Sequence, residues 1–175
     1  MKQVSGFTLL EVLVVVAIMG ILLTMSVGPL KSLYASSAEK EAARNVLGAL
    51  RLARSNAISQ NLEYQVAFDL DSQTFWLERG NIPEGSTSWS RVREFDRFLP
   101  SLKMATGALC TNDAASDGDG TSAADNMIQF NPSGTCGSSG TANARYICVM
   151  NNGVVQYRSG VPSSSTGRAV IDNGE

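Results

Sequence analysis

The stretch "GFTLLEVLVVVAIMGILLTMSV", residues 6–27, decides how the rest of the chain is interpreted. From residue 7 onward it is apolar apart from two threonines, one serine and one carboxylate, that of Glu11. As a helix that rises about 1.5 Å per residue, it spans about 30 Å, the thickness of a bilayer's hydrocarbon core. An ionised carboxylate at that depth costs about 2.5–3.5 kcal/mol. The stretch therefore predicts a membrane-spanning helix in which Glu11 needs a compensating partner.

The residues around this run favour a retained anchor over a secretory signal peptide. The leader "MKQVSG" carries a single lysine, and no Ala-x-Ala site closes the apolar run. The run is also longer than the apolar region of about 7–15 residues in a secretory signal. Lys2 on the short side favours a cytoplasmic N-terminus, which places everything after the run in the periplasm or outside the cell.

Two interpretations of Glu11 remain open. In the first, the carboxylate is tolerated near the helix end, where it is protonated or reaches the interface. In the second, cleavage after Gly6 gives Phe7 a free α-amine one helical turn from Glu11. In parallel helices staggered by about one turn, the amine of one chain meets Glu11 of the next, so that only the assembled state offsets the burial cost. This second hypothesis predicts that Glu11 sets the register of an assembly.

The composition argues against an enzyme. The 175 residues carry a net charge of −2, which gives no global field to draw the chain to DNA or to an anionic membrane. The chain has no histidine, the commonest general base and metal ligand. Hydrolases of the Ser-His-Asp or Cys-His kind are thereby excluded in their usual form. We expect no catalytic residues and no cofactor.

A second helical segment follows the apolar run. Gly28 and Pro29 predict a kink or melted turn, because proline lacks a backbone donor and glycine lowers helix propensity. The helix should resume over residues 30–61, where apolar residues recur at spacings of three and four. They form one narrow face of mostly small side chains: Ala38, Ala42, Val46, Ala49 or Leu50, Ala53 and Ala57. Such a face predicts close approach to a sheet.

The remainder, residues 62–175, carries strand patterns. Residues 62–70 alternate apolar and polar side chains, and a turn at residues 71–73 leads to a partner strand at 74–79. Asn151-Asn152-Gly153 marks a hairpin, because Asn-Gly is a strong two-residue turn signal. Further strands are expected around residues 92–95, 102–104, 127–130, 145–150 and 154–158. The predicted fold class is α+β, with one long N-terminal helix whose first half is transmembrane and whose second half packs on antiparallel sheet.

Two features of the C-terminal half suggest further chemistry. The segment 110–125 supplies candidate oxygen ligands for Ca²⁺ at Asp113, Asp117, Asp119 and Asp125, but it does not match the EF-hand pattern, and a solvated loop without metal is the favoured interpretation. The cysteines Cys110, Cys136 and Cys148 form no CxxC motif. In an oxidising compartment one disulfide and one thiol are expected, with the pairing open, and three small buried residues are the alternative.

The stretch "GFTLLEVLVVVAIMGIL" resembles the class III signal of type IV pilins and pseudopilins. The match includes Gly6, Phe7 and Glu11 and a short basic leader. The resemblance implies that prepilin peptidase removes a leader, residues 1–6, and N-methylates Phe7. It also implies a transmembrane and filament-core helix over residues 7–29. The implied partners are other pilins or pseudopilins, prepilin peptidase, the inner-membrane assembly platform and, before assembly, the lipid bilayer.

A second resemblance covers much of the remainder. The block 42–79, with "ARSNAI" at 53–58, is similar to the GspH/FimT branch of pseudopilins and minor pilins, as are "IQFNPSG" at 128–134 and "GRAVI" at 167–171. The branch implies a minor pseudopilin that supports protein secretion through a type II system. The alternative within the family is a type IV minor pilin for pilus biogenesis, adhesion or DNA uptake. The implied location is the bacterial inner membrane, crossed once with the C-terminal domain periplasmic, and later a periplasmic or surface filament.

Two rival functions fit the sequence less well. Members of the FimT side bind DNA through a basic C-terminal stretch, but here Arg168 stands alone and is followed by Asp172 and Glu175, so few counterions would be released. Nucleic acid is therefore not an expected partner. The alternative from a different class is a membrane-anchored periplasmic module that binds a ligand or calcium and never polymerises.

Overall fold

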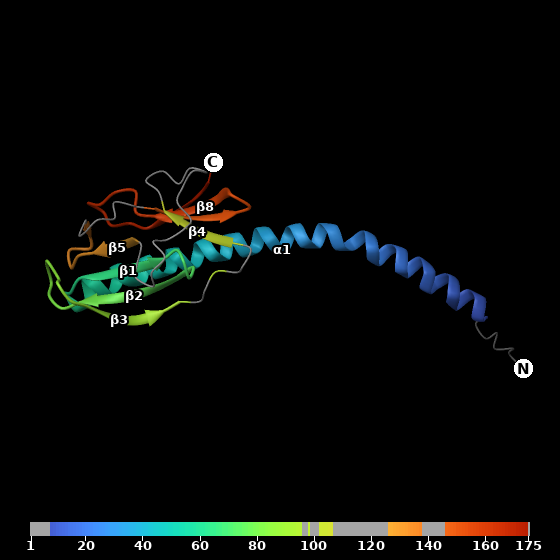
Figure 1. Cartoon of the computed structure of the whole chain (residues 1–175), viewed down its shortest axis with the longest axis horizontal. Coiled ribbons are helices and arrows are strands. Elements are labelled where there is room, and N and C mark those ends of the chain that lie inside the picture. Colours follow the sequence, from blue (N-terminus) through green and yellow to red (C-terminus); the bar gives the residue numbers. More distant parts are fainter. Residues whose placement is uncertain (1–7, 96–97, 99–101, 107–125, 138–145, 175) are drawn as a thin grey trace, which may run out of the picture. The chain divides into compact units, whose positions relative to one another are not determined.

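The computed structural model describes residues 8–95, 98, 102–106, 126–137 and 146–174, with the backbone alone over residues 25–35 (Figure 1). The chain forms two compact units, Met1–Ser37 and Ala38–Glu175. Their boundary lies within a single helix, α1 (Leu9–Gln60). The second unit is an α+β domain built from the C-terminal part of α1 and nine antiparallel strands in the described part of the chain.

The helix α1 continues through Gly28 and Pro29. Of the two alternatives predicted at this pair, the melted turn is therefore wrong, and the kink stays a prediction. Proline's fixed φ is itself helical, so Pro29 removes one backbone hydrogen bond without forcing the chain out of helical geometry, and Gly28 costs only about 1 kcal/mol. Regular turns on both sides sustain the helix. None of the helical segments that the structure describes is both long and apolar enough to cross a membrane.

The strands of the second unit form two sheets, one of five strands in the order β3-β2-β1-β5-β6 and one of four in the order β4-β7-β8-β9. Every pairing is antiparallel. The strands are β1 (Tyr64–Asp69), β2 (Thr74–Gly80), β3 (Trp89–Glu94), β4 (Leu102–Thr106), β5 (Asn126–Phe130), β6 (Cys136–Gly137), β7 (Tyr146–Asn151), β8 (Val154–Gly160) and β9 (Val170–Asn173). The sequence predicted antiparallel pairing but not its division into two sheets.

One face of α1 packs against both sheets, and Figure 1 shows β1 and β2 alongside this part of the helix. The predicted narrow face is confirmed, because its members from Ala42 to Ala57 are all buried. The sheets contribute large side chains to the same core, among them Tyr64, Phe68, Phe75, Leu77, Phe130, Met104, Ile147 and Val149.

β1 is buried on both of its faces, although apolar and polar residues alternate along its sequence. Gln65 and Asp69 are each only 3% exposed. The Gln65 amide donates to a Glu78 carboxylate oxygen at 2.7 Å, and Asp69 accepts from the following turn. A central strand between β2 and β5 keeps polar side chains inside when such hydrogen bonds replace water. The polar side chains of β1 therefore lie inside the domain and do not mark a solvent-exposed face.

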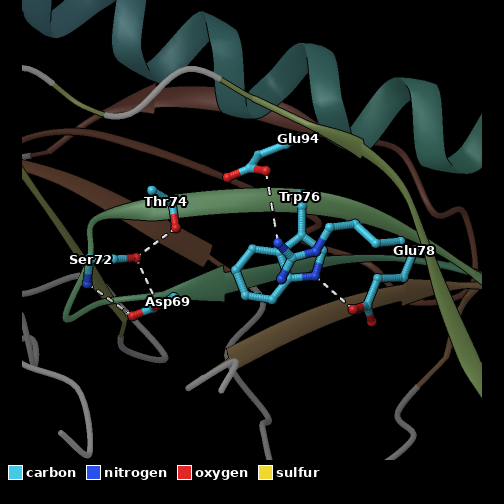
Figure 2. A network of polar contacts seen from close by, with 7 residues as sticks. Asp69, Ser72, Thr74, Trp76, Glu78 and Glu94 are labelled. Carbon is cyan, nitrogen blue, oxygen red and sulfur yellow. Dashed lines mark hydrogen bonds and ion pairs between the residues drawn. The ribbon is translucent and has the colours of Figure 1, made fainter. Parts of the chain in front are cut away.

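The predicted turn between β1 and β2 is confirmed and is held by Asp69 (Figure 2). One Asp69 oxygen accepts from the backbone N–H groups of Asp71 and Ser72, at 2.9 and 3.0 Å. The other accepts from the Ser72 hydroxyl at 2.7 Å, and that hydroxyl lies 2.6 Å from Thr74 Oγ1. Asp side chains commonly stabilise turns in this way. The side chain thus fixes the register in which β2 returns along β1.

The predicted hairpin between β7 and β8 is also confirmed. Asn152 and Gly153 have φ values of 51° and 76°, as a type I′ turn requires at its two central positions. Two strands were not expected from the sequence. β6 has only two residues, and β9 pairs with β8 at the edge of the four-stranded sheet.

The edge strand β3 carries its charges next to an aromatic ring. The Arg91 guanidinium lies 3.9 Å from the Trp76 ring centroid and 3.8 Å from a Glu94 oxygen. Figure 2 shows the Trp76 indole N–H directed at Glu78, to which it donates at 2.6 Å. Charged side chains on an edge strand disfavour unspecific strand pairing.

Candidate assembly surface

α1 begins with a capped first turn. The backbone N–H of Glu11 donates to the Thr8 hydroxyl at 3.3 Å and to the Thr8 carbonyl at 3.1 Å. Thr8 is therefore the N-cap residue and Glu11 the third residue of the helix, the spacing of a capping box. A carboxylate in the first turn also interacts favourably with the helix dipole. The Thr-x-x-Glu spacing is visible in the sequence and was the signal that could have placed the start of this helix.

Beyond the cap, the helix exposes apolar side chains on all sides. Every described side chain from Thr8 to Thr24 is exposed. Twelve large apolar residues are 46–83% exposed: Leu9, Leu10, Val12, Leu13, Val14, Val15, Val16, Ile18, Met19, Ile21, Leu22 and Leu23. A helix that is apolar all round is normally buried. The surface formed by residues 9–23, called the apolar segment below, is therefore uncovered in the part of the chain that the structure describes.

A shallow groove of about 670 Å³ lies along the start of α1 and is lined by Thr8 and, within the apolar segment, by Leu9, Val12, Leu13, Val16 and Ala17. Their spacing of three and four is that of a seam between packed helices. At about 100° per residue, Glu11 lies on roughly the opposite side of the helix from this seam. One helix can therefore offer an apolar contact and a charged contact to different neighbours.

Several residues predicted as sites lie outside the described residues. These are Gly6 and Phe7 of the expected cleavage site, Cys110, and the candidate calcium ligands Asp113, Asp117, Asp119 and Asp125. In the described ranges, no group of three or more His, Cys, Asp or Glu side chains is arranged to hold a metal ion. Cys148 is buried in β7 and is disulfide-bonded. This agrees with the alternative of one disulfide and one thiol rather than three small buried residues. Cys136 is half-buried in β6.

Arg54 joins three stretches that are distant in the sequence. Its Nε donates to the carbonyl of Gly134 at 3.0 Å, and its Nη2 donates to the carbonyl of Thr166 at 3.1 Å. The "ARSNAI" stretch, the end of "IQFNPSG" and the residue just before "GRAVI" thus meet at one guanidinium. Arg54 is half-buried and fastens the C-terminal segment to α1. No sequence pattern indicated these carbonyl partners.

Replacing Gly167 by alanine should destabilise the domain strongly. Gly167 has φ +57°, and a Cβ built on it would lie 1.9 Å from the Gly134 carbonyl oxygen. We expect a loss of about 2–4 kcal/mol in the free energy of unfolding, from strain and a forced shift of the Arg54 junction. The full chain in detergent, unfolded with guanidinium chloride, gives the measurement.

Gly153→Ala is the matched control for this prediction. Gly153 also has a positive φ, of +76°, but a Cβ added to it would meet no atom within 4 Å. It should lose only about 1 kcal/mol, the cost of the backbone conformation. Equal losses in the two variants would show that the close approach of Gly167 to Gly134 is unimportant.

The arrangement defines a class of protein. A long N-terminal helix exposes an apolar first part with one carboxylate, and its second part packs on antiparallel sheets. This is the architecture of a pilin-like filament subunit, as the sequence predicted.

Comparisons with known proteins agree with the assignment to this class. The family model for the prokaryotic N-terminal methylation motif matches residues 1–27, and that for the type II transport protein GspH matches residues 42–172. The second match covers most of the chain, which therefore belongs to the type II transport protein GspH family. It is a minor pseudopilin or pilin subunit of type II secretion or type IV pili, a structural family whose members assemble with other pilins. No curated protein sequence matches the chain.

Solved structures of one minor pseudopilin share the fold. Two structures of the minor pseudopilin EpsH from the type 2 secretion system of Vibrio cholerae each align with a TM-score of 0.56. The first is 14% identical and covers 78% of this chain and 96% of its own; the second is 13% identical and covers 81% and 97%. The type IV minor pilin FimU of Pseudomonas aeruginosa is 19% identical, with a TM-score of 0.49 and coverage of 77% and 88%.

Proposed function

We propose that the chain is processed between Gly6 and Phe7 and then enters a filament through the apolar segment. The observation that carries the proposal is that twelve large apolar side chains lie uncovered in one helix, interrupted by the single carboxylate of Glu11. In this account prepilin peptidase removes residues 1–6 and methylates the Phe7 amine. The mature chain starts one residue before the cap of α1.

The balance of energies supports burial of the apolar segment in an assembly. Burying one Leu, Val or Ile side chain contributes about 1.5–3 kcal/mol. Placing the Glu11 carboxylate in an apolar surrounding costs about 2.5–3.5 kcal/mol. Two or three of the twelve side chains offset that cost, so the carboxylate does not prevent burial. Before assembly, lipid would have to cover the same surface, which supports an inner-membrane location with the sheet domain in the periplasm.

The free-energy cost of burying the Glu11 carboxylate nevertheless affects the register in which neighbouring helices pack. Apolar contacts are non-directional, so parallel helices coated with Leu, Val and Ile can slide with little change in energy. A carboxylate paired with a neighbour's Phe7 amine is satisfied in only one stagger, and an unpaired buried charge is strongly unfavourable. Many staggers of the helices would bury a similar apolar area, and Glu11 therefore selects one register among them. The Thr8 cap holds the turn that presents it.

The family match favours a type II secretion filament, which supports protein secretion, over the alternative of a type IV pilus. A membrane assembly platform that extracts the subunit is part of the same proposal. The alternative from a different class of protein is a membrane-anchored periplasmic module that binds a ligand or calcium and never polymerises. It predicts that the apolar segment contacts lipid and no other subunit.

Crosslinking in cells separates the two classes. Val16→Cys lies in the groove of the apolar segment, and Val154→Cys, 47% exposed on β8, is the matched position in the sheet domain. With the other subunits of the filament co-expressed, a membrane-permeable crosslinker should join Val16→Cys to another pilin-like chain, identified by mass spectrometry. Absence of any such product at Val16→Cys, in cells that assemble filaments, would refute the polymerising subunit.

A further inference from the structure

A basic pocket lies near the C-terminal end of α1, in the sheet domain. It has a volume of about 370 Å³ and is lined by Arg51, Arg54, Ser55, Ile58, Arg168 and Ala169. The four helix residues follow the spacing i, i+3, i+4, i+7, so they form one stripe of α1. Arg168 and Ala169 enter from the segment before β9. Among the described residues, the lining contains three guanidinium groups and no carboxylate.

The positive charge of this pocket is uncompensated in the described part of the chain. Arg51 and Arg168 are exposed, and neither guanidinium forms an ion pair with a described carboxylate. Asp172, the acidic residue closest in sequence to Arg168, instead lies 3.7 Å from Arg158. Like charges brought together without a counter-charge repel one another, so this arrangement costs stability unless an anion binds.

The geometry also orients the pocket. Arg54 is fixed by the carbonyls of Gly134 and Thr166, which use its Nε and one Nη2 donor. A guanidinium has five N–H donors, so others remain for a ligand. Gly167, at φ +57°, packs on Gly134 and holds the backbone that carries Arg168 beside Arg54. The pocket is thus built on a rigid junction, and only Arg51 and Arg168 must order when a ligand binds.

We infer that this pocket binds a carboxylate group, an Asp or Glu side chain presented by a neighbouring protein chain. Planar guanidinium groups match carboxylates in bidentate geometry. Ile58, 48% exposed, and Ala169 add an apolar wall that suits the methylene groups of such a side chain. The inference rests on the proposed function, which supplies neighbouring chains, and names a contact of the sheet domain in addition to the helix.

A nucleic acid fits the same pocket less well. Binding a strand requires a basic track that follows several phosphates, and aromatic side chains on which bases stack. None of the six lining residues is aromatic. Asp172, in the edge strand β9 that follows Arg168 in the sequence, interrupts any basic track there. One compact charge is therefore the better match than an extended polyanion.

Fluorescence anisotropy on the full chain in detergent tests the inference directly. The probes are fluorescein-labelled, C-terminally amidated hexaglutamate and hexaglutamine, and a labelled thymidine heptanucleotide. The six phosphodiesters of the heptanucleotide match the six side-chain carboxylates of hexaglutamate in number. Hexaglutamate should bind saturably, and Arg51→Ala with Arg168→Ala should weaken it about tenfold. The control pair Arg44→Ala with Arg79→Ala removes two exposed guanidinium groups elsewhere with the same change in net charge and should alter binding less than about twofold.

Three results would overturn the inference. Hexaglutamate that does not bind, or binds equally to both double variants, would exclude the pocket as its site. Hexaglutamine binding as tightly as hexaglutamate would exclude recognition of the charge. Tighter binding of the heptanucleotide than of hexaglutamate, lost in the Arg51/Arg168 variant, would assign the pocket to nucleic acid instead.

A second measurement uses the assembling cell. A photo-crosslinking amino acid in place of Ile58 should capture a neighbouring subunit through a peptide that contains Asp or Glu, and the Arg51/Arg168 variant should lower the yield severalfold. Capture only through peptides without a carboxylate, or an unchanged yield, would contradict the inference. The Val16→Cys crosslink reports assembly independently, so loss of that product signals failure of the proposed function rather than of the pocket.

Discussion

Glu11→Gln is expected to reduce incorporation of the full chain into filaments by about 100-fold or more. Removing one partner of a buried ion pair leaves the other charge uncompensated, at a cost of about 3–5 kcal/mol. In the assembled state that charge is the Phe7 amine of the neighbouring chain. The cap at Thr8 uses the backbone N–H of residue 11, which glutamine retains, so α1 should still form. Insertion into the membrane should be unchanged or improved, because a charge has been removed.

The measurement compares the subunit content of sheared filaments with that of the membrane fraction. Glu41→Gln removes an exposed carboxylate from the same helix, in the sheet domain, and should incorporate normally. Glu11→Asp keeps the charge on a shorter side chain and should restore part of the incorporation. If Glu11→Gln incorporates as well as Glu41→Gln, the carboxylate is only a helix-capping group, whose loss costs about 1 kcal/mol or less.

Phe75→Ala is expected to lower the free energy of unfolding of the sheet domain by about 3–5 kcal/mol. Phe75 is fully buried in β2, and its ring centroid lies 5.7 Å from that of Phe68, 5.0 Å from that of Phe95 and 6.1 Å from that of Phe98. Truncation would leave a cavity lined by three rings that β-sheet backbone prevents from collapsing. A loss of this size is a large fraction of the stability of an ordinary domain, about 5–15 kcal/mol.

Guanidinium unfolding of the full chain, followed by far-ultraviolet circular dichroism, measures this loss. Val92→Ala, 51% exposed on the edge strand β3, is the control and should change stability by less than about 0.5 kcal/mol. A loss below about 1 kcal/mol for Phe75→Ala would show that the aromatic cluster does not hold β1, β2 and the segment after β3 together.

Elements specified by local patterns were predicted well. The apolar face from Ala42 to Ala57 follows helical spacing, and the helix buries it as expected. The Asn152-Gly153 turn requires two positive φ values, which these residue types tolerate, so the hairpin followed from its sequence. The apolar run up to Val27 was predicted to be helical, and α1 includes it from Leu9 onward.

Features that depend on distant contacts were not predicted. The polar face of β1 is buried because Gln65 and Asp69 find hydrogen-bond partners within the domain, which no alternation pattern encodes. Arg54 is a structural junction because its carbonyl acceptors come from residues 80 and 112 positions away. Pro29 stays helical because a single lost hydrogen bond is smaller than the cooperative stability of the surrounding turns. Local patterns indicate where polar groups occur, and tertiary structure decides which of them are satisfied.

The most direct test of the account is the intact mass of the full chain purified from the membranes of cells that contain prepilin peptidase. The account predicts a polypeptide that lacks residues 1–6 and carries one additional methyl group, with the fragment spectrum placing that group on the amine of Phe7. The same chain from cells without the peptidase should retain Met1. A mature chain that begins at Met1 in both strains, or anywhere beyond Val27, would remove the amine that Glu11 is proposed to meet and would contradict assembly through the apolar segment.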